Sequence, residues 1–300
     1  MAVLSQVKYE TIYLAIRELH DTASYPIQKL CELAGIQRSS YYKWLDRKES
    51  ANEQMNKELI LLIKDAYQER NGILGYRQMT IKLNRDHNLN ANHKRVYRLM
   101  KLLKLKSVCR RKRKNYVQST PEITAENILN RDFSANQFGE KWLTDVTEMK
   151  YNLDRKAYLS AILDLGDKSI VAFVLGHSNN NELVFKTFDM ARKENPDAAP
   201  LFHSDRGFQY TSKRFQKKLV NAGMTQSMSR VSRCIDNGPM EAFWGMLKSE
   251  MYYLKKFNSY DELEAAVIEY IDYYNNHRYQ KRLNCMTPLE YRQYLFNTVA

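Results

Sequence analysis

The sequence has few of the cysteines that form disulfides in secreted proteins or bind structural zinc. Its 300 residues include only 4 cysteines, which lie far apart, with no Cys-x-x-Cys pair and no His-Cys cluster at zinc spacing. We therefore expect free thiols in a reducing compartment. The chain is also poor in residues that break regular structure, with 10 glycines and 6 prolines against 44% hydrophobic residues, so most of it is expected to fold.

Long apolar runs are missing as well. No window approaches the roughly 18 apolar residues of a membrane span. The N-terminal segment already carries charge where a signal peptide has its apolar block. These absences predict a soluble, intracellular protein with no part in a membrane. The chain is long enough for a sizeable core and for more than one domain.

The one strong excess in the composition is positive charge, and it is unevenly distributed. Residues 1–135 contain 25 lysines and arginines against 14 aspartates and glutamates, whereas residues 136–300 contain 22 against 20. A basic first half beside a nearly neutral second half favours binding of a polyanion by the first half, most simply a nucleic acid. A solubilising surface is the alternative, and it accounts less well for the uneven split.

Residues 1–50 have the pattern of a helix-turn-helix domain. The stretch SYPIQKLCELAGIQRSSYYKWLDR predicts an amphipathic helix, a turn at Gly35 and a second helix capped by serine. Such a pair is typical of a DNA-binding motif, in which Arg38 and Lys43 are candidate DNA contacts. An ordinary helical corner with Trp44 in its core is the alternative, and the basic charge of this half favours DNA binding.

Residues 51–107 predict a second helical domain of the same kind. In the stretch ANHKRVYRLMKLLKLK, apolar residues recur on one helical face, and Lys94, Arg95 and Arg98 lie around that face. This arrangement suits a second DNA-reading helix. A solvated basic face would give the same pattern for any single cation.

A basic linker is expected over residues 108–135. Five consecutive cations precede a Thr-Pro segment: Arg110, Arg111, Lys112, Arg113 and Lys114. A run of like charges cannot pack into a core, so it predicts a linker or a segment that follows DNA phosphates. We place the main domain boundary here, before a catalytic domain with a helical tail over residues 136–300.

The second half alternates between strand and helix patterns. Strands are expected at 141–151, 157–165, 169–176, 200–207 and 224–230, and helices at 181–195, 211–223, 237–254 and 259–278. This order predicts an α/β sheet with helices on its faces.

Three carboxylates in this half form a candidate metal site. Asp145 lies in the middle of an apolar strand, where a charge is costly unless it is paired or bound to metal. Asp205 ends a later strand, and 35 residues separate it from Glu241 at the start of a helix. Lys248 follows Glu241 by two helical turns. Converging carboxylates suit Mg²⁺, which takes one or two of them with phosphate oxygens, and two such ions can serve phosphodiester transfer.

Each carboxylate also has an ordinary interpretation. A single aspartate after a strand is usually a turn residue or a helix cap. A glutamate in the first turn of a helix interacts favourably with the helix dipole. Asp145 is the hardest of the three to explain in this way, because the strand around it is apolar.

The segments WLTDVTEM, LFHSDRGFQYTS, SRCIDNGPMEAFWGMLKSE and YIDYYNNHRYQKRLNCMTPLEY together resemble one known family. Residues 136–290 are similar to the integrase core of DDE transposases, specifically the insertion-sequence-3 family of bacterial mobile elements. The helical first half is similar to the upstream part of the same family's proteins. The resemblance implies an α/β ribonuclease-H-like core, with a mixed five-stranded sheet flanked by helices, preceded by all-α helix-turn-helix domains.

The resemblance also implies a function and a set of site residues. It implies a DNA transposase that cleaves and joins strands at the ends of an insertion sequence. Asp145, Asp205 and Glu241 would be its catalytic residues and hold two Mg²⁺ ions, for which Mn²⁺ would substitute. Five further residues match the family's motifs and are expected to shape the site or hold DNA: His203, Gly207, Tyr210, Asn237 and Lys248. Arg206 is another candidate DNA contact.

The resemblance implies two kinds of partner. One is double-stranded DNA, both as the terminal inverted repeats of the element and as the target. The other is further copies of the chain, in a dimer or larger assembly on DNA. The implied location is the cytoplasm, at the bacterial nucleoid.

Family members often work fused to the product of an upstream reading frame. Because the chain begins with Met1 and has no sustained heptads before residue 20, we interpret it as the second-frame product alone or a member that needs no fusion. The upstream product is thus a candidate partner.

A second function remains open at this stage. The chain could be a DNA-binding regulator that occupies the element ends without cutting them, as a partner or inhibitor of a longer fusion transposase. The complete set of three carboxylates argues against a loss of catalysis.

Overall fold

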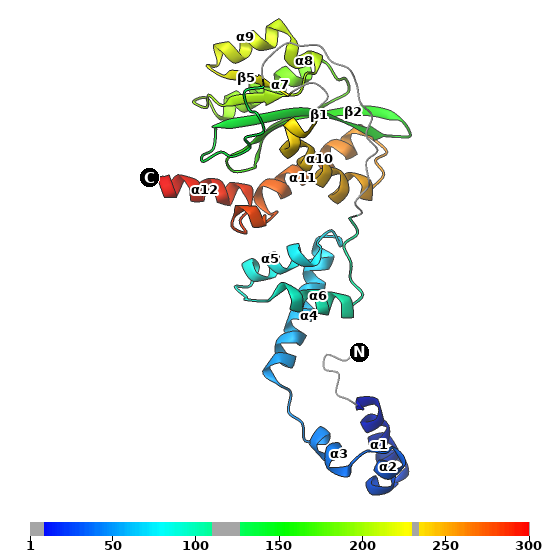
Figure 1. Ribbon diagram of the computed structural model, residues 1–300. Helices are drawn as coiled ribbons and strands as arrows, with labels where there is room; N and C mark the ends of the chain where they lie inside the picture. Colours follow the sequence, from blue (N-terminus) through cyan, green and yellow to red (C-terminus); the bar gives the residue numbers. More distant parts are fainter. Residues whose placement is uncertain (1–8, 110–126, 230–233, 300) are drawn as a thin grey trace. The chain divides into compact units, whose positions relative to one another are not determined.

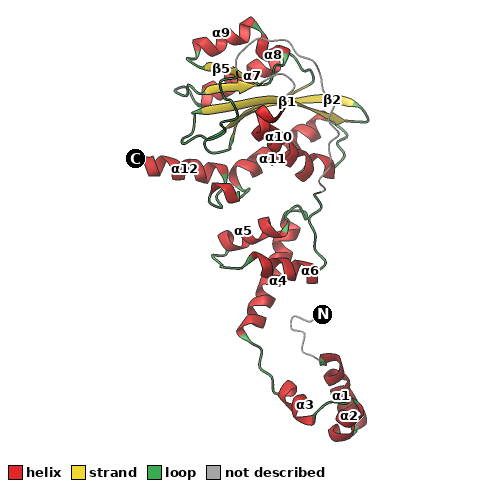
Figure 2. Cartoon of the chain, in the orientation of Figure 1, coloured by secondary structure: helices red, strands yellow, loops and turns green. Residues whose placement is uncertain are grey.

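The computed structural model describes residues 9–109, 127–229 and 234–299, so the predicted basic run from Arg110 to Lys114 lies outside the described residues. The chain divides into two compact units, residues 1–107 and residues 108–300. Figure 2 shows that the first unit is helical and that the second combines strands with helices. Among the helices of the described ranges, none is both long and apolar enough to span a membrane.

The first helices of unit one form a small cluster. They are α1 (Glu10–Ala23), α2 (Ile27–Leu33) and α3 (Arg38–Leu45). The turn between α2 and α3 contains Gly35 at a φ of +65°, a conformation that glycine adopts without steric cost. Trp44 stacks on Tyr13 with ring centroids 5.4 Å apart, so the tryptophan joins α3 to α1.

A second helical cluster follows in the same unit. It consists of α4 (Ala51–Glu69), α5 (Tyr76–Asp86) and α6 (His93–Leu102). Ser50 and Glu53 form a capping box that starts α4. The apolar stripe predicted on α6 is confirmed, because Val96, Leu99 and Met100 are buried against the other two helices.

The second unit is built on a mixed sheet of five strands, which confirms the predicted fold class. The strands are β1 (Lys141–Tyr151), β2 (Arg155–Asp164), β3 (Ile170–Gly176), β4 (Leu201–Ser204) and β5 (Thr225–Met228). Their order across the sheet is β3-β2-β1-β4-β5. β1, β2 and β3 pair antiparallel, whereas β1, β4 and β5 are parallel. β1 is therefore the strand at which the direction of pairing changes.

Helices cover both faces of this sheet (Figure 1). One face carries α7 (Asn181–Glu194), α8 (Phe208–Thr211) and α9 (Lys213–Asn221), and the other carries α10 (Gly238–Glu250) and α11 (Tyr260–Asn276). Trp142 and Leu143 are neighbours in β1, both fully buried, and they belong to the two opposite cores. This is the alternation expected of a strand with two covered faces.

Short turns of helix and a last helix complete the unit. They are the 3₁₀ turns at Cys234–Asn237, Tyr252–Leu254 and Lys281–Leu283, and α12 (Pro288–Val299). The predicted helix at 211–223 differs in detail, since a short helix already runs from Phe208 to Thr211. The side chain of Ser212 then accepts a hydrogen bond from the Phe215 amide and starts α9 anew.

A buried ion pair ties the end of α10 to the end of α11. Arg278 donates to both carboxylate oxygens of Glu250, at 2.9 and 2.7 Å, and the Tyr270 hydroxyl donates to the same carboxylate at 3.0 Å. Arg278 is only 8% exposed. Removing one member of such a pair leaves an uncompensated charge inside the protein.

We expect Glu250→Gln to lower the free energy of unfolding by about 3 kcal/mol, because it leaves the Arg278 charge buried without a counter-ion. Urea denaturation followed by tryptophan fluorescence measures this. The matched control is Glu148→Gln, which removes an exposed pair with Lys156 at 3.0 Å and is expected to cost less than about 1 kcal/mol. Equal losses in the two variants would contradict the role given to the buried pair.

Candidate active site

The register of two parallel strands brings two predicted site residues together. β1 and β4 pair with Leu143 opposite His203. Two residues further along the same register, Asp145 stands beside Asp205, which directly follows the last residue of β4. Neighbouring strands lie about 4.8 Å apart. The side chain of Asp145 lies on the face of Leu143, which is the face covered by α10 and α11.

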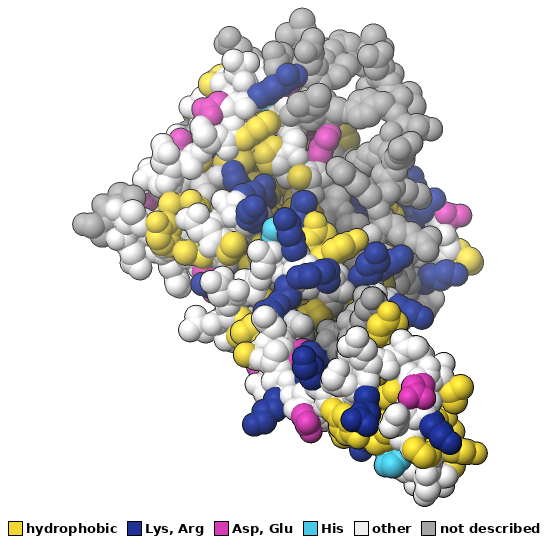
Figure 3. All heavy atoms as spheres, turned by 60° about the horizontal axis from the view of Figure 1, so that its bottom comes forward, with side chains coloured by type: hydrophobic (Ala, Val, Ile, Leu, Met, Phe, Trp, Pro, Cys, Tyr) yellow, Lys and Arg dark blue, Asp and Glu magenta, His cyan; other side chains and the backbone are white. Residues whose placement is uncertain are grey.

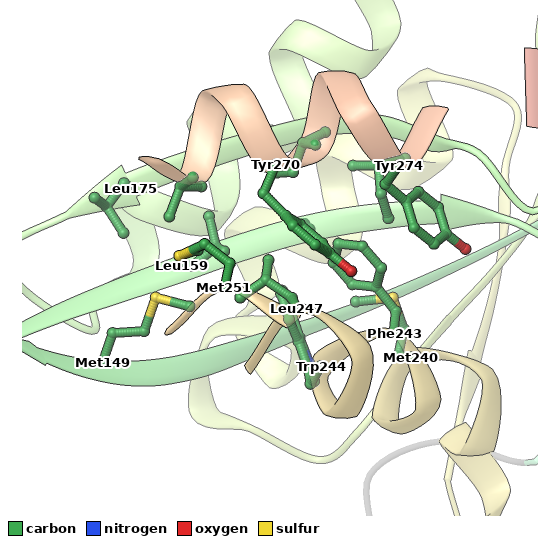
Figure 4. Packing of buried hydrophobic residues seen from close by; sticks show 14 of the residues in the cluster. Met149, Leu159, Leu175, Met240, Phe243, Trp244, Leu247, Met251, Tyr270 and Tyr274 are labelled. Carbon is green, nitrogen blue, oxygen red and sulfur yellow. The ribbon is translucent and has the colours of Figure 1, made fainter. Parts of the chain in front are cut away.

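Helix α10 brings the third carboxylate to the same place. Glu241 lies in its first turn, and the indole of Trp244, one turn later, donates to Asp145 Oδ2 at 3.0 Å. Figure 4 shows how Phe243, Trp244 and Leu247 pack against the strands. Phe243 and Leu247 are fully buried, so the apolar side of α10 fixes where Glu241 stands.

The electrostatics of Asp145 reflect this crowding. Burial raises the pKa of its carboxyl group to about 7, and repulsion from Asp205 and Glu241 adds to the rise. Hydrogen bonds from the Val146 amide, at 2.8 Å, and from Trp244 act in the opposite direction.

Asp205 is less enclosed than Asp145. Its side chain reaches solvent, yet the surrounding protein still raises its pKa by desolvation, against a hydrogen bond of 2.8 Å from the Gly207 amide.

The donor set fits a hard cation such as Mg²⁺. The three side chains offer only carboxylate oxygens, and a bound cation would offset both the burial of Asp145 and the nearby negative charge that raise its pKa. Among the described residues, no three His, Cys, Asp or Glu side chains are already gathered as a ligand cage. Mg²⁺ does not require such a cage, since it binds one or two carboxylates and takes its other ligands from phosphate and water.

Three residues expected to shape the site or hold DNA are buried, and their burial favours the first of these two roles. They are His203, Tyr210 and Asn237, at 0%, 1% and 5% exposed. His203 lies between the hydroxyls of Ser227 and Ser229, at 2.9 and 3.1 Å. Burial lowers its pKa to about 4, which keeps the ring neutral near pH 7, and a neutral buried ring does not attract phosphate.

Tyr210 and Asn237 instead support the strand that carries Asp145. The Tyr210 hydroxyl and the Thr144 hydroxyl lie 3.1 Å apart. Asn237 donates to the Thr144 carbonyl oxygen at 3.1 Å. Because Thr144 precedes Asp145 in β1, these bonds hold the backbone on which the carboxylate stands.

Arg206 and Lys248 lie near the carboxylates and keep part of their surface accessible to solvent. Arg206 follows Asp205 in the chain and donates to the Ser229 carbonyl oxygen at 2.7 Å. Lys248 stands on α10, two turns after Glu241, and is half-buried. Both cations therefore lie in the same unit and neighbourhood as the three carboxylates.

Two residues that matter here carried weaker sequence signals. Trp244 donates to Asp145, and its spacing of three from Glu241 on a helix could have indicated a shared face. Gln209 is 3% exposed and hydrogen bonds to Asn179 in the loop before α7. No pattern in the sequence indicates that bond, because the two residues come from separate elements.

The candidate DNA contacts of the first unit differ in exposure. Arg38 and Lys43 are exposed on α3, and Lys94 and Arg98 are exposed on α6. Arg95 instead donates to Asn52 Oδ1 of α4 at 2.5 Å and reaches the Met55 sulfur at 2.8 Å, so its guanidinium joins α6 to α4. On the face that Figure 3 presents, Lys and Arg side chains are more frequent than Asp and Glu.

Comparison with known proteins assigns each unit to a described family. Residues 54–113 match an HTH-like domain, and residues 135–234 and 241–296 match two integrase core domains. The chain is 40% identical over 269 residues to InsK of insertion sequence element IS150 from Escherichia coli (strain K12), named as a transposase, covering 89% of this chain and 94% of that protein. It is 30% identical over 248 residues to the transposase for insertion sequence element IS904 from Lactococcus lactis, covering 81% and 97%.

A solved structure is also similar. The catalytic core domain of HTLV-2 integrase, in complex with magnesium, is 19% identical with a TM-score of 0.43, covering 52% of this chain and 97% of that one.

We expect Asp145→Asn to stabilise the metal-free protein only above the pH at which the carboxyl group ionises in the unfolded chain. Folding raises its pKa from 3.8 to about 7. The resulting loss of folding free energy is therefore absent below about pH 4, grows between about pH 4 and pH 7, and is complete above pH 7. At about pH 8 in EDTA, the variant should gain about 2 kcal/mol in free energy of unfolding.

Urea denaturation at about pH 8 and about pH 4 measures the difference. Asp197→Asn, at an exposed position in the same unit, is the control and should change stability at neither pH. An equal gain for Asp145→Asn at both pH values would show that relief of ionisation is not its cause.

Proposed function

The chain belongs to the insertion-sequence-3 family of transposases, and from this we propose that Asp145, Asp205 and Glu241 carry out its chemistry. A transposase with an integrase core cleaves DNA and transfers its strands. The observation that supports the assignment is the convergence of three carboxylates: the parallel register sets Asp145 beside Asp205, and Glu241 on α10 lies close enough to add to the raised pKa of Asp145. Repelling carboxylates at a strand seam are expected where a cation completes the site.

The reaction has two phosphodiester exchanges. Water attacks a phosphodiester at the element end, its proton passes to solvent, and the bond to the 3′ oxygen breaks to leave a 3′ hydroxyl. That hydroxyl then attacks a second phosphodiester, and the displaced oxygen leaves as the new strand joins. Two Mg²⁺ ions, or Mn²⁺ in their place, would activate the attacking oxygen and stabilise the leaving one.

The chain's own residues bind and orient in this scheme. Asp145 and Asp205, ionised, would be the shared ligands at the strand seam, with Glu241 across from them on α10. Lys248 would form a charge-assisted contact with a phosphate beside the scissile one. The hydrogen bond from Trp244 favours the ionised form of Asp145, which is the form that binds metal.

DNA recognition belongs to the other parts of the chain in this proposal. We assign residues 1–50 and 51–107 to two helix-turn-helix domains, 108–135 to a basic linker and 136–300 to the catalytic domain. The exposed cations of α6 would read the terminal repeats in the major groove, and the linker would follow phosphates. Bringing two ends and a target together requires a dimer or larger assembly on DNA, to which the upstream-frame product could add.

Asp205→Asn is expected to abolish strand cleavage while leaving DNA affinity within about twofold, because it removes a metal ligand and no phosphate contact. A labelled duplex containing the DNA that flanks the gene, with Mg²⁺, measures both. Binding without cleavage by the native chain would favour a regulator that only occupies the ends. Undiminished cleavage by the variant would refute the assignment of Asp205.

Arg98→Ala is expected to reduce the preference for element-end DNA over unrelated DNA about tenfold, since a base contact by arginine contributes about 1–3 kcal/mol of discrimination. Competition binding with both DNAs measures the ratio. Lys64→Ala on the exposed side of α4 is the matched control and should leave the ratio unchanged. A uniform loss of affinity for both DNAs in Arg98→Ala would indicate a phosphate contact instead.

A further inference from the structure

A groove with a volume of about 610 Å³ lies between helix α7 and the α8–α9 segment. Phe208, the first residue of α8, lines it and comes three residues after Asp205 in the chain. One wall of the groove is therefore continuous with the turn that carries a proposed catalytic carboxylate.

The turn between Asp205 and Phe208 is held tightly. The Gly207 amide donates to Asp205 Oδ1 at 2.8 Å, and buried Gln209 bonds to Asn179 in front of α7. A Cβ at Gly207 would lie 2.8 Å from Gln209 Oε1 and 3.0 Å from Asp205 Oδ1. A side chain at this position would displace the ends of these two side chains, whereas glycine leaves the two hydrogen bonds that hold the groove wall beside the carboxylate.

Phe208 is an unusual wall residue because its ring faces solvent. It is 59% exposed, whereas Phe185 and Phe215 nearby are 7% and 0% exposed. Within the described ranges, no aromatic ring or cation stacks on Phe208. Of the nine residues that line the groove, only the two phenylalanines are apolar, and the others are charged or carry an amide. A single ring among polar groups suits a ligand that combines an aromatic face with charge.

The charge of the groove is positive. Glu182 pairs with Lys186 at 3.1 Å, and Asp189 pairs with Lys218 at 2.6 Å. Arg214 stacks over the Phe185 ring at 5.5 Å and has no carboxylate partner among the described residues. Helix α9, which carries Arg214, contains further lysines and no acidic residue. The Arg214 guanidinium is therefore the cation of the groove that can bind an anionic ligand.

We propose that this groove binds an unpaired nucleotide of the DNA next to the scissile phosphate, with its base stacked on Phe208 and its phosphate at Arg214. This inference rests on the proposed function, since it takes Asp205 as the place of cleavage. A base within a duplex is already stacked on both faces, whereas an unpaired base offers a face to an exposed ring. Aromatic stacking with a cation along the backbone is how single strands are generally bound.

The test compares two probes, a blunt DNA duplex and the same duplex with a single-stranded oligo-dT extension, by fluorescence anisotropy with the full-length chain in EDTA. Phe208→Ala should bind the extended probe about tenfold more weakly and the blunt probe as the native chain does. Phe208→Trp, which keeps a stacking ring, should restore binding. Val220→Ala, 73% exposed on α9 and outside the groove, is the matched control.

The phosphate contact has its own readout. Arg214→Gln should reduce the slope of log affinity against log salt for the extended probe by about one. Lys193→Gln, at an exposed position of α7 outside the groove, should leave that slope unchanged.

Several results would overturn the groove assignment. One is native-like affinity of Phe208→Ala for the extended probe, and another is an equal loss for both probes. A lower molar mass of Phe208→Ala in ultracentrifugation, with unaltered DNA affinity, would assign the ring to a protein contact instead. Because binding is measured in EDTA, where no cleavage occurs, failure of the Asp205 prediction and failure of the groove can be told apart.

Discussion

The second unit of this chain is organised around the cost of holding negative charge at the seam between β1 and β4. The parallel register sets Asp145 beside Asp205, and desolvation raises the pKa of both carboxyl groups. Hydrogen bonds from Val146, Trp244 and Gly207 offset only part of that cost. Two apolar cores, one on each face of the sheet, stabilise the fold enough to offset the cost of placing these carboxylates between β1 and β4.

Helix α10 joins the stability of the fold to the geometry of the site. Its apolar side, with Phe243 and Leu247 fully buried, packs in the core beside α11. The same helix presents Glu241 and the Trp244 indole to Asp145. The pair of Glu250 and Arg278 fixes the far end of the helix. A shift of this one helix would therefore move a carboxylate and disturb the core together.

Charged and neutral polar residues have separate places around the seam. The buried groups are His203, kept neutral by its lowered pKa, and the Tyr210 and Asn237 side chains that support Thr144. Being neutral, they hold the backbone without cancelling the charge of the carboxylates. The exposed cations stand elsewhere, on α3, α6 and α9, where a polyanion can reach them. The site thus retains its negative charge for a metal, and the surface retains positive charge for DNA.

The sequence by itself determined the elements and the identity of the candidate site residues. Apolar periodicity predicted the strands and helices of the second unit, and an aspartate within an apolar strand marked Asp145, because burial of a lone charge is too costly to be incidental. The boundary at Ser212 needed the observed cap, since a capping serine and an interior serine look alike in sequence.

Only the tertiary structure decided which polar residues face solvent and which face the protein. His203 and Arg95 are as polar in sequence as Lys94 and Arg98, yet one is enclosed by two serines and the other is bonded to α4. The exposure of a side chain depends on contacts between elements that are distant in the chain. The hydrogen bond from Trp244 to Asp145 likewise joins two such elements, α10 and β1. Local patterns carry no record of such contacts, because they arise when separate elements pack together.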